Sequence, residues 1–540
     1  MELTRGISRR AILSWIGKTA GAAAMYQAMT SLGFASESTF DKDHYELSGA
    51  PEGSTVLVLG AGLAGMTAAF ELQKAGYKVK ILEYNEKAGG RCWTIRGGDK
   101  YTELGGATQE CKFDEGLYIN PGPWRIPYHH YAVLHYCKQF DVKLEVFNQI
   151  NHNAYVHSAN AFDGKPKRYR EVYSDFQGHI AELLAKCVNQ KGLDEAMTRE
   201  ETERLLLVMR EWGALNGDDK YVKSVEASLR RGFDVEPGGG LMPEEQYSLP
   251  MDRHELLDSS LWKHLVTGNL FEYQSTIFQP IGGMDMVAKG FEKEVGNLIR
   301  YSSKVTKIHQ DNKGVTVSYI DSKSPGDTMT ESADWCVCTI PLSILGQIPA
   351  NFSSKLTSAI RAVPYDTGVK VGLQFKRRFW EEDDRIYGGI SYTDMPIEMI
   401  SYPSTDYHSS GKGVLLGGYL WDENAYEFTA MSPEMRVKKA LEYGAKIHPQ
   451  YLDEFDNGIA VAWHRVPWTN GCYGLWTPES RKEHYQNLCE IDNRVVLAGE
   501  HASYIPAWME GAILSSLDAI KRLHEHAVAA NKQNAQGSQS

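Results

Sequence analysis

A glycine-rich turn near the start of the chain limits the possible folds more than any other feature. The run STVLVLGAGLAG places a short apolar strand, residues 56–59, directly before Gly60, Gly62 and Gly65. A helix is expected from about Ala64 to Ala75, and YKVKILE follows it as a second strand. A strand, a helix and a second strand in this order form a βαβ unit, so a parallel sheet covered by helices is predicted.

Each glycine of this turn has a separate use if the turn binds a dinucleotide. Gly60 permits the tight turn, Gly62 lets a pyrophosphate approach the backbone, and Gly65 lets helix and strand pack closely. Glu83 ends the second strand, where a carboxylate can accept hydrogen bonds from both ribose hydroxyls. Glycine-rich turns are common, but here strand, helix, second strand and acidic residue all fall where the dinucleotide fingerprint requires them.

A second glycine pair indicates which dinucleotide is bound. The run GGRCWT begins six residues after Glu83, and its Arg91 supplies another cation that can face a phosphate. This arrangement closely resembles the FAD-binding module of the flavin amine oxidase family, and plain nicotinamide dehydrogenases do not usually carry it. The resemblance continues at KVTKI, ADWCVCTIPLSIL, the pair Phe379-Trp380 and AGEHASYIPAWMEGA, and so covers about residues 52 to 525.

The resemblance implies FAD as the cofactor and a set of residues that hold it. It implies that Val305 contacts the adenine and Met509 the flavin ring, both through the backbone, and that Glu500 lies at the ribityl-phosphate region. A structural carboxylate beside a strand end is the alternative for Glu500. Cys472 matches the position where monoamine oxidases attach flavin covalently, but a cysteine there is only permissive, and we expect non-covalent FAD. The full expected set is Gly60, Gly62, Leu63, Ala64, Gly65, Glu83, Gly90, Arg91, Val305, Gly499, Glu500, Trp508 and Met509.

An arginine in a rigid turn indicates the substrate. In GPWRIPYHHY, Arg125 stands between Trp124 and Ile126-Pro127, with no acidic residue within five positions on either side. Within the family, this segment most resembles the Gly-Pro-x-Arg-x-Pro of L-amino acid oxidases, the snake-venom enzymes included, whose arginine grips the substrate carboxylate. A planar guanidinium offers two parallel donors to a carboxylate, and the prolines fix their direction. The alternative is a salt bridge to an Asp or Glu distant in sequence.

The resemblance also implies a catalytic lysine. Lys370, in TGVKVGLQF, matches a family lysine that hydrogen-bonds a water near flavin N5. The period-two alternation of this strand puts its valines on one face and Lys370, Gly372 and Gln374 on the other, so a lysine on a wet face is the alternative.

Aromatic residues are expected around the substrate. Tyr473 and Trp508 fall where the family builds aromatic walls around the substrate amine, although either could be core, and Trp124 could line the pocket or pack the turn. Where venom enzymes place a carboxylate-holding tyrosine, the matching puts Gly418, with Tyr419 adjacent. A one-residue shift or a bulge would restore that contact.

These residues predict FAD-dependent oxidative deamination of L-amino acids by O2, which gives 2-oxo acids, ammonia and hydrogen peroxide. Arg125 would anchor the carboxylate, and Lys370 would position the water that hydrolyses the imine. Three alternatives stay open: a primary-amine or polyamine oxidase, an amino acid monooxygenase that decarboxylates its substrate to an amide, and a flavoprotein with a binding role only.

The expected architecture is α/β (α+β overall), with a Rossmann-like FAD-binding domain, a mixed-sheet substrate domain and a helical insert. A capping box at Thr198 and Glu201 marks a helix within the insert. The expected segments are 52–115, 273–345 and 490–530 for the FAD-binding domain, 116–164, 246–272 and 346–489 for the substrate domain, 165–245 for the helical domain and 531–540 for a disordered tail.

The remaining sequence features concern partners and location. A net charge of -12 argues against nucleic acid as a partner, and eight cysteines without zinc-type spacing indicate neither a disulfide scaffold nor a metal site.

The start of the chain concerns location. The run SRRAILSWIGKTAGAAAMYQAM resembles a twin-arginine export signal within residues 1–35, so a periplasmic or secreted protein is expected. The alternative is an amphipathic first helix. No later stretch reaches the roughly 20 apolar residues of a membrane span. The oligomeric state stays open, a homodimer included.

Overall fold

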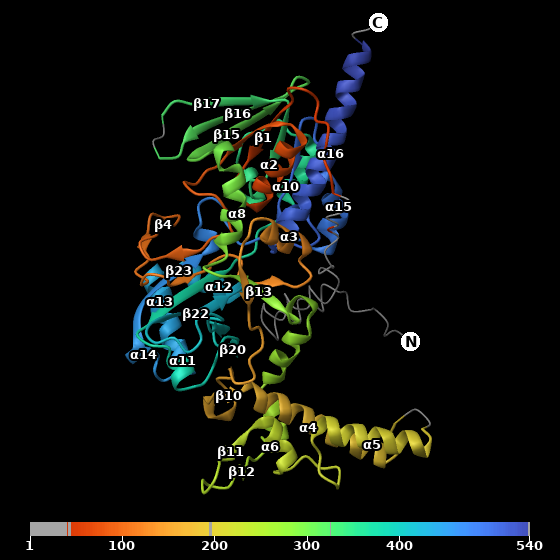
Figure 1. The fold of residues 1–540 in the computed structure, drawn as a ribbon, viewed down its shortest axis with the longest axis vertical. Helices are drawn as coiled ribbons and strands as arrows, with labels where there is room; N and C mark the ends of the chain where they lie inside the picture. The colour runs from red at the N-terminus through yellow and green to blue at the C-terminus, as the bar shows by residue number, and fades with distance from the viewer. Residues whose placement is uncertain (1–39, 41–44, 194–196, 324–325, 538–540) are drawn as a thin grey trace, which may run out of the picture.

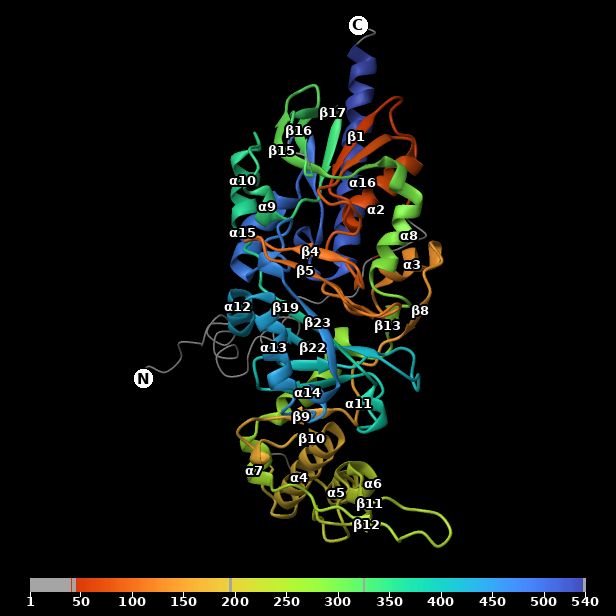
Figure 2. The same cartoon turned by 90° about the vertical axis from the view of Figure 1, so that its left-hand side faces the viewer.

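The computed structural model describes residues 40, 45–193, 197–323 and 326–537 of the chain. Three parts follow one another along the long axis of the molecule, as both views show (Figures 1 and 2). The dinucleotide-type domain and the end of the chain lie at one end, a large sheet lies in the middle, and a helical insert lies at the other end. The proposed export signal lies outside the described residues. Within them, no helix combines the length and the apolar character needed to cross a membrane.

The first sheet confirms the βαβ unit. Its five strands run in the order β14-β2-β1-β18-β24, and every pair is parallel. Strand β1 is buried along almost its whole length because Val56 and Val58 pack in one cluster with helices, whereas Leu57 and Leu59 pack on the other face in a cluster that includes residues 305–319. The elements of this layer are β1 (Thr55–Leu59), α2 (Leu63–Ala75), β2 (Lys78–Leu82), α8 (Asp285–Val295), β14 (Ile299–Arg300), β18 (Trp335–Cys338), β24 (Val495–Leu497) and α16 (Met509–Gly537).

The second sheet carries the substrate side of the molecule. Its seven strands run in the order β10-β9-β20-β21-β22-β19-β23, and all pairs are antiparallel except β9 with β20, so the mixed sheet expected from the sequence is present. The strands are β9 (Tyr155–His157), β10 (Lys167–Arg168), β19 (Val369–Phe375), β20 (Ile390–Thr393), β21 (Met399–Ser401), β22 (Gly413–Leu420) and β23 (Phe455–Ala462).

Shorter elements connect these layers. A separate antiparallel sheet, β15 (Ser303–Gln310), β16 (Val315–Asp321) and β17 (Met329–Ala333), lies beside the first sheet (Figure 1). Strands β7 (Ile126–Pro127), β13 (Ile277–Pro280) and β8 (Leu144–Val146) form a small sheet that fixes the turn after Arg125.

The helical insert projects from the substrate sheet (Figure 1). It contains α4 (Tyr169–Asn189), α5 (Arg199–Gly213) and α6 (Val225–Arg231). The expected capping box is present at the start of α5: Thr198 Oγ1 accepts from Glu201 N at 3.2 Å, and Glu201 Oε2 accepts from Thr198 N at 2.8 Å.

One expectation and one alternative differ from the structure. Helix α16 continues to Gly537, well into the segment 531–540 that was expected to be disordered, because the Ala, Lys and Gln residues of that segment are good helix formers. Lys370 is not on a wet face: all seven residues of β19 are buried. The face opposite the valines is covered by the segment 114–122, whose Ile119 would contact a Cβ placed on Gly372.

Candidate functional site

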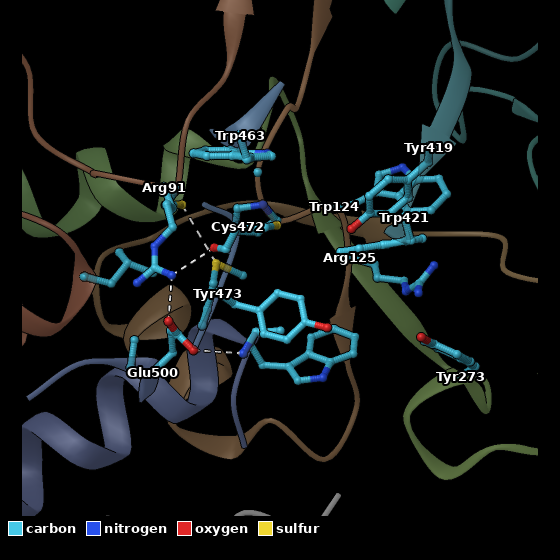
Figure 3. Close-up of a pocket in the computed structure, with 18 of the residues that line it drawn as sticks. Arg91, Trp124, Arg125, Tyr273, Tyr419, Trp421, Trp463, Cys472, Tyr473 and Glu500 are labelled. Atoms are coloured by element: carbon cyan, nitrogen blue, oxygen red, sulfur yellow. Dashed lines mark hydrogen bonds and ion pairs between the residues drawn. The ribbon is translucent and has the colours of Figure 1, made fainter. Parts of the chain in front are cut away.

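A cavity lies where the first sheet meets the substrate sheet. The glycine turn and the start of α16 form one end of it, and the Arg125 turn, β20 and β22 form the other (Figure 3). Of the residues predicted at the cofactor, the cavity is lined by Gly62, Leu63, Ala64, Arg91, Gly499, Glu500, Trp508 and Met509. Gly60, Gly65, Glu83, Gly90 and Val305 lie outside this lining.

The glycine turn has the shape that a phosphate group requires. Gly60 has a φ of 102°, in the region that favours glycine, and a Cβ on Gly65 would lie 1.9 Å from Gly60 O. By contrast, a Cβ on Gly62 would meet nothing within 4 Å, so the backbone there is open to the cavity. Helix α2 begins at the next residue, and its first amides have no partners within the helix. The turn therefore fits a pyrophosphate.

Glu83 braces this turn from behind. Its carboxylate accepts hydrogen bonds from Ala61 N at 2.6 Å and from Asn85 N at 2.7 Å. Burial raises the pKa of Glu83, and these backbone donors act in the opposite direction. Ser303 N donates to Glu83 O at 2.7 Å, which places Val305, two residues further along β15, near the acidic end of β2. Glu83 and Val305 thus lie at the same end of the first sheet.

Arg91 and Glu500 form the ion pair at the cofactor end. Arg91 Nη1 lies 2.6 Å from Glu500 Oε1, and the same nitrogen donates to Cys472 O at 2.9 Å (Figure 3). Glu500 also accepts from Gly474 N and Ala507 N, both at 3.2 Å. The Glu500 carboxylate therefore joins segments that are distant in sequence, as a structural carboxylate would. The same side chain also forms part of the cavity wall.

Arg125 lies at the opposite end, and aromatic rings surround it. Its Cζ is 4.2 Å from the centre of the Tyr273 ring, 4.9 Å from that of Trp124 and 6.0 Å from that of Trp508. Its Nη1 donates to Gln149 Oε1 at 2.9 Å. No Asp or Glu of the described ranges forms an ion pair with it within 4.0 Å, so the alternative of a salt bridge is not met there. A cation is thus held in the wall by neutral groups.

A bulge in β22 brings Tyr419 into the cavity. The pairing of β19 with β22 shifts by one residue between Val371 and Gly372, which makes Gly417 the extra residue. A bulge of this kind redirects the side chains that follow it. Tyr419 consequently lines the cavity and packs edge to face against Trp124, with ring centres 5.6 Å apart.

Lys370 lies directly behind this wall. Its Nζ donates to Gly122 O at 2.6 Å and to Asn120 O at 3.2 Å, and it is 4.3 Å from the centre of the Tyr419 ring. Burial lowers the pKa of Lys370 to about 7, and the charge of Arg125 acts in the same direction. Lys370 is not among the residues that line the cavity.

Two aromatic residues that were singled out in the sequence, Tyr473 and Trp508, lie in the cavity wall. Figure 3 shows Tyr473 between Glu500 and Arg125. Tyr473 Oη donates to Asp366 Oδ2 at 2.8 Å, and Trp508 packs edge to face against the buried His130 at 4.9 Å. Cys472 also lines the cavity, and burial raises the pKa of its thiol to about 12.

Sequence reasoning missed several residues of the distal wall. Gln149, Tyr273 and Tyr392 meet around Arg125, although they come from three separate segments. Their residue types carry no motif, so only the path of the chain in space could have identified them. Further lining residues that were missed are His264, Thr267, Ile390, Met399, Trp421 and Trp463.

The cavity thus offers a dinucleotide turn at one end and, at the other, a cation that has no acidic partner among the residues described. Aromatic rings between them suit a flat cofactor and a small apolar or aromatic group beside it. Within the described residues, no group of three His, Cys, Asp or Glu side chains could hold a metal ion.

Comparison with known proteins places this geometry in context. The family model described as flavin containing amine oxidoreductase matches residues 63–523. An L-amino-acid oxidase of Siganus canaliculatus is 29% identical over 87% of this chain and 85% of its own length. The L-amino-acid oxidase BmooLAAO-I of Bothrops moojeni is 28% identical over 86% of this chain and 88% of its own. The solved cyclohexylamine oxidase of Brevibacterium oxydans matches 88% of this chain and 99% of its own with a TM-score of 0.57 at 17% identity, which shows the shared fold.

Proposed function

The chain belongs to the flavin-containing amine oxidoreductase family, and from this premise we propose that it oxidises L-amino acids to 2-oxo acids, ammonia and hydrogen peroxide. The observation that carries this proposal is Arg125, a guanidinium in the cavity wall with an amide partner and no ion pair among the described residues. A ligand with a carboxylate supplies the missing anion, and an amine without one does not. Two similar proteins carry the name L-amino-acid oxidase, which supports an amino acid as the substrate.

FAD is the proposed cofactor. The open backbone at Gly62 and the first amides of α2 would hold its pyrophosphate, and the first turn of α16 would lie beside the flavin. When bound, the flavin would supply an acceptor for the hydride of the substrate Cα and a route for its electrons to O2. We propose that it is held non-covalently, because a Cys472 thiol with a pKa of about 12 stays protonated and is a poor nucleophile.

Arg125 orients the substrate. Two parallel N–H groups of a guanidinium match the two oxygens of a carboxylate, and the rings of Trp124 and Tyr273 keep its plane from turning. With the carboxylate fixed, Tyr473 and Trp508 confine the amine and the Cα–H between them. Orientation of this kind supplies a large part of the rate, since effective molarities in well-aligned reactions reach about 10⁵ M or more.

The substrate amine must be neutral for the hydride to leave Cα, and catalysis therefore improves as the pH rises through the pKa of the bound amine. Lys370 is proposed to hold the water that hydrolyses the imine. Lys370 donates to the carbonyls of Asn120 and Gly122, so in the neutral form that prevails above its pKa of about 7 both N–H groups are used, and the lone pair is left to accept a hydrogen bond from a water.

A peroxide assay with matched pairs of compounds tests the proposal. L-phenylalanine, D-phenylalanine and phenethylamine differ only in the carboxylate or in its direction, and ammonia and CO2 are measured beside the peroxide. We expect peroxide and ammonia from the L-amino acid alone, without CO2. Faster turnover of phenethylamine would identify an amine oxidase, CO2 with an amide would identify a monooxygenase, and no reduction of the flavin by any compound would indicate a binding role.

Export is a second part of the proposal. The paired arginines of the sequence SRRAILSW support a twin-arginine signal, and that route carries folded proteins, which suits an enzyme that takes up its cofactor before export. Changing Arg9 and Arg10 together to lysine should keep the protein in the cytoplasm. If the double variant still appeared outside the cytoplasm, the export proposal would be wrong, and the catalytic proposal would be unaffected.

A further inference from the structure

The partner of Arg125 is an amide, and its chemistry fixes how it is oriented. Gln149 is only 3% exposed. Its Oε1 accepts from Arg125 Nη1 at 2.9 Å, and its Nε2 donates to Tyr392 Oη at 3.2 Å. Because a guanidinium can only donate, the amide oxygen must face Arg125 and the NH₂ group must face Tyr392. Both ends of Gln149 are therefore used.

Tyr392 is itself held in place. Its ring stacks on His264 with centres 5.0 Å apart and planes 13° apart, and it lies in β20 of the substrate sheet. The amide of Gln149 thus connects Arg125 to a wall built from the sheet and from the segment after the helical insert. The direction of the guanidinium is set through this connection.

An acid is nearby, but it is kept out of ion-pair distance. Glu272 is 2% exposed, its Oε1 has no hydrogen-bond partner among the described residues, and burial raises its pKa while the charge of Arg125 lowers it. No ion pair within 4.0 Å joins the two among those residues. The neighbourhood therefore provides Arg125 with a neutral hydrogen bond and leaves its charge uncompensated at contact distance.

We propose that Gln149 is a positioning residue that aims Arg125 at the substrate carboxylate while leaving its positive charge available to that carboxylate. This inference rests on the proposed function of Arg125. A glutamate at the same position would have the same shape and would form an ion pair with Arg125, so it would compete with the carboxylate of the ligand. The neutrality of the amide, and not its size alone, is the property that matters.

Three variants of the FAD-loaded full-length protein test the inference. Gln149→Glu adds a charge at constant shape, Gln149→Met removes the hydrogen bonds without a charge, and Tyr392→Phe removes one brace of the amide while keeping the ring. Two quantities are measured: the KM for L-amino acids, and the Kd for benzoate, read from the flavin absorbance without turnover. Benzylamine, a ligand of similar shape that lacks the carboxylate, is the matched control.

We expect Gln149→Glu to raise both the KM and the benzoate Kd by about tenfold or more, which is the effect of losing one charge-assisted hydrogen bond, with a smaller effect on kcat. Gln149→Met should raise them by less, and Tyr392→Phe by least. Benzylamine binding should not weaken in Gln149→Glu.

Equal effects of Gln149→Glu and Gln149→Met, or weaker binding of benzylamine as well, would show that Gln149 serves packing only and would overturn the inference. An unchanged benzoate Kd in Gln149→Glu would overturn it too. A failure of the proposed function looks different: the wild type would then oxidise no L-amino acid, whereas benzoate binding would still report whether Gln149 controls the charge of Arg125.

Discussion

Two arginines line the same cavity, and their surroundings are opposite. Arg91 has an acidic partner, Glu500, at 2.6 Å, whereas Arg125 has an amide and three aromatic rings. A charge that is compensated within the protein holds segments together, and one that is left uncompensated is available to a ligand. This difference predicts a structural role for Arg91 and a ligand-binding role for Arg125, and five measurements test it.

The largest effect is expected for Arg91→Ala. Glu500 would keep a carboxylate that is 6% exposed and would lose its cation. Leaving a buried charge unpaired costs about 3 kcal/mol of the free energy of unfolding, so urea unfolding should show this loss together with a lower flavin content. Arg91→Lys keeps the charge and should lose less. Normal stability and full flavin content in Arg91→Ala would remove the distinction between the two arginines.

Arg125→Met should give the reverse pattern. The variant loses two charge-assisted hydrogen bonds to the substrate carboxylate, so the KM for L-amino acids should rise about 100-fold. Stability should fall by about 1–2 kcal/mol, because the buried Gln149 Oε1 loses its donor, and so by less than in Arg91→Ala. The flavin content should stay at the wild-type level. A KM within twofold of the wild type would contradict the assignment of Arg125.

Lys370 differs from the two arginines because its side chain can lose its charge. In the unfolded chain its pKa returns to about 10.5, and in the folded protein it is about 7. Between these values the unfolded state binds the extra proton, so the wild type gains stability as the pH rises. Relative to Lys370→Met, the wild type should gain about 2 kcal/mol between pH 7 and pH 9, measured by urea unfolding. A constant difference would show that Lys370 stays charged.

Tyr473→Phe is expected to have a smaller effect. The variant keeps the aromatic wall and loses the hydrogen bond of 2.8 Å to Asp366. The pKa of Asp366, which burial already raises, should rise further because that hydrogen bond lowers it. The loss should be about 1 kcal/mol of stability with a KM close to that of the wild type. A tenfold rise in KM would instead indicate that the Tyr473 hydroxyl contacts the substrate.

Thr198→Ala is expected to have the smallest effect and serves as a reference far from both arginines. It removes the N-cap of α5 in the helical insert and should cost about 0.5–1 kcal/mol. The KM and the flavin content should both stay unchanged. A change in either would mean that the insert influences the cavity, and the stability effects above would then need correction for it.

Local features of the site could be predicted from the sequence, and features that depend on the path of the chain could not. The glycine turn directly follows β1, and Arg91 lies shortly after the end of β2, so their spacing along the chain carries the geometry. Arg125 could be singled out because its turn holds no acid. Gln149 and Tyr273, which complete its surroundings, are distant in sequence and belong to no motif.

The substrate sheet shows why alternation alone was insufficient. Period two assigned Lys370 to the face opposite the valines, and that face is covered by the segment 114–122 and not by water. The bulge at Gly417 was a stated alternative, but a pair of glycines in a strand does not reveal which one is extra. The burial of Lys370 and the position of the bulge both depend on contacts between segments that are distant in sequence, and the periodicity of one strand gives no information about such contacts.

The strand order of the first sheet has a consequence for biosynthesis. Strand β24 (Val495–Leu497) joins the sheet beside β18, and α16 then covers it, so a segment far along the chain completes the domain that β1 began. Glu500, Trp508 and Met509 are made together with that segment. A nascent chain therefore has no finished pocket until this segment has been synthesised, and cofactor capture must follow its synthesis.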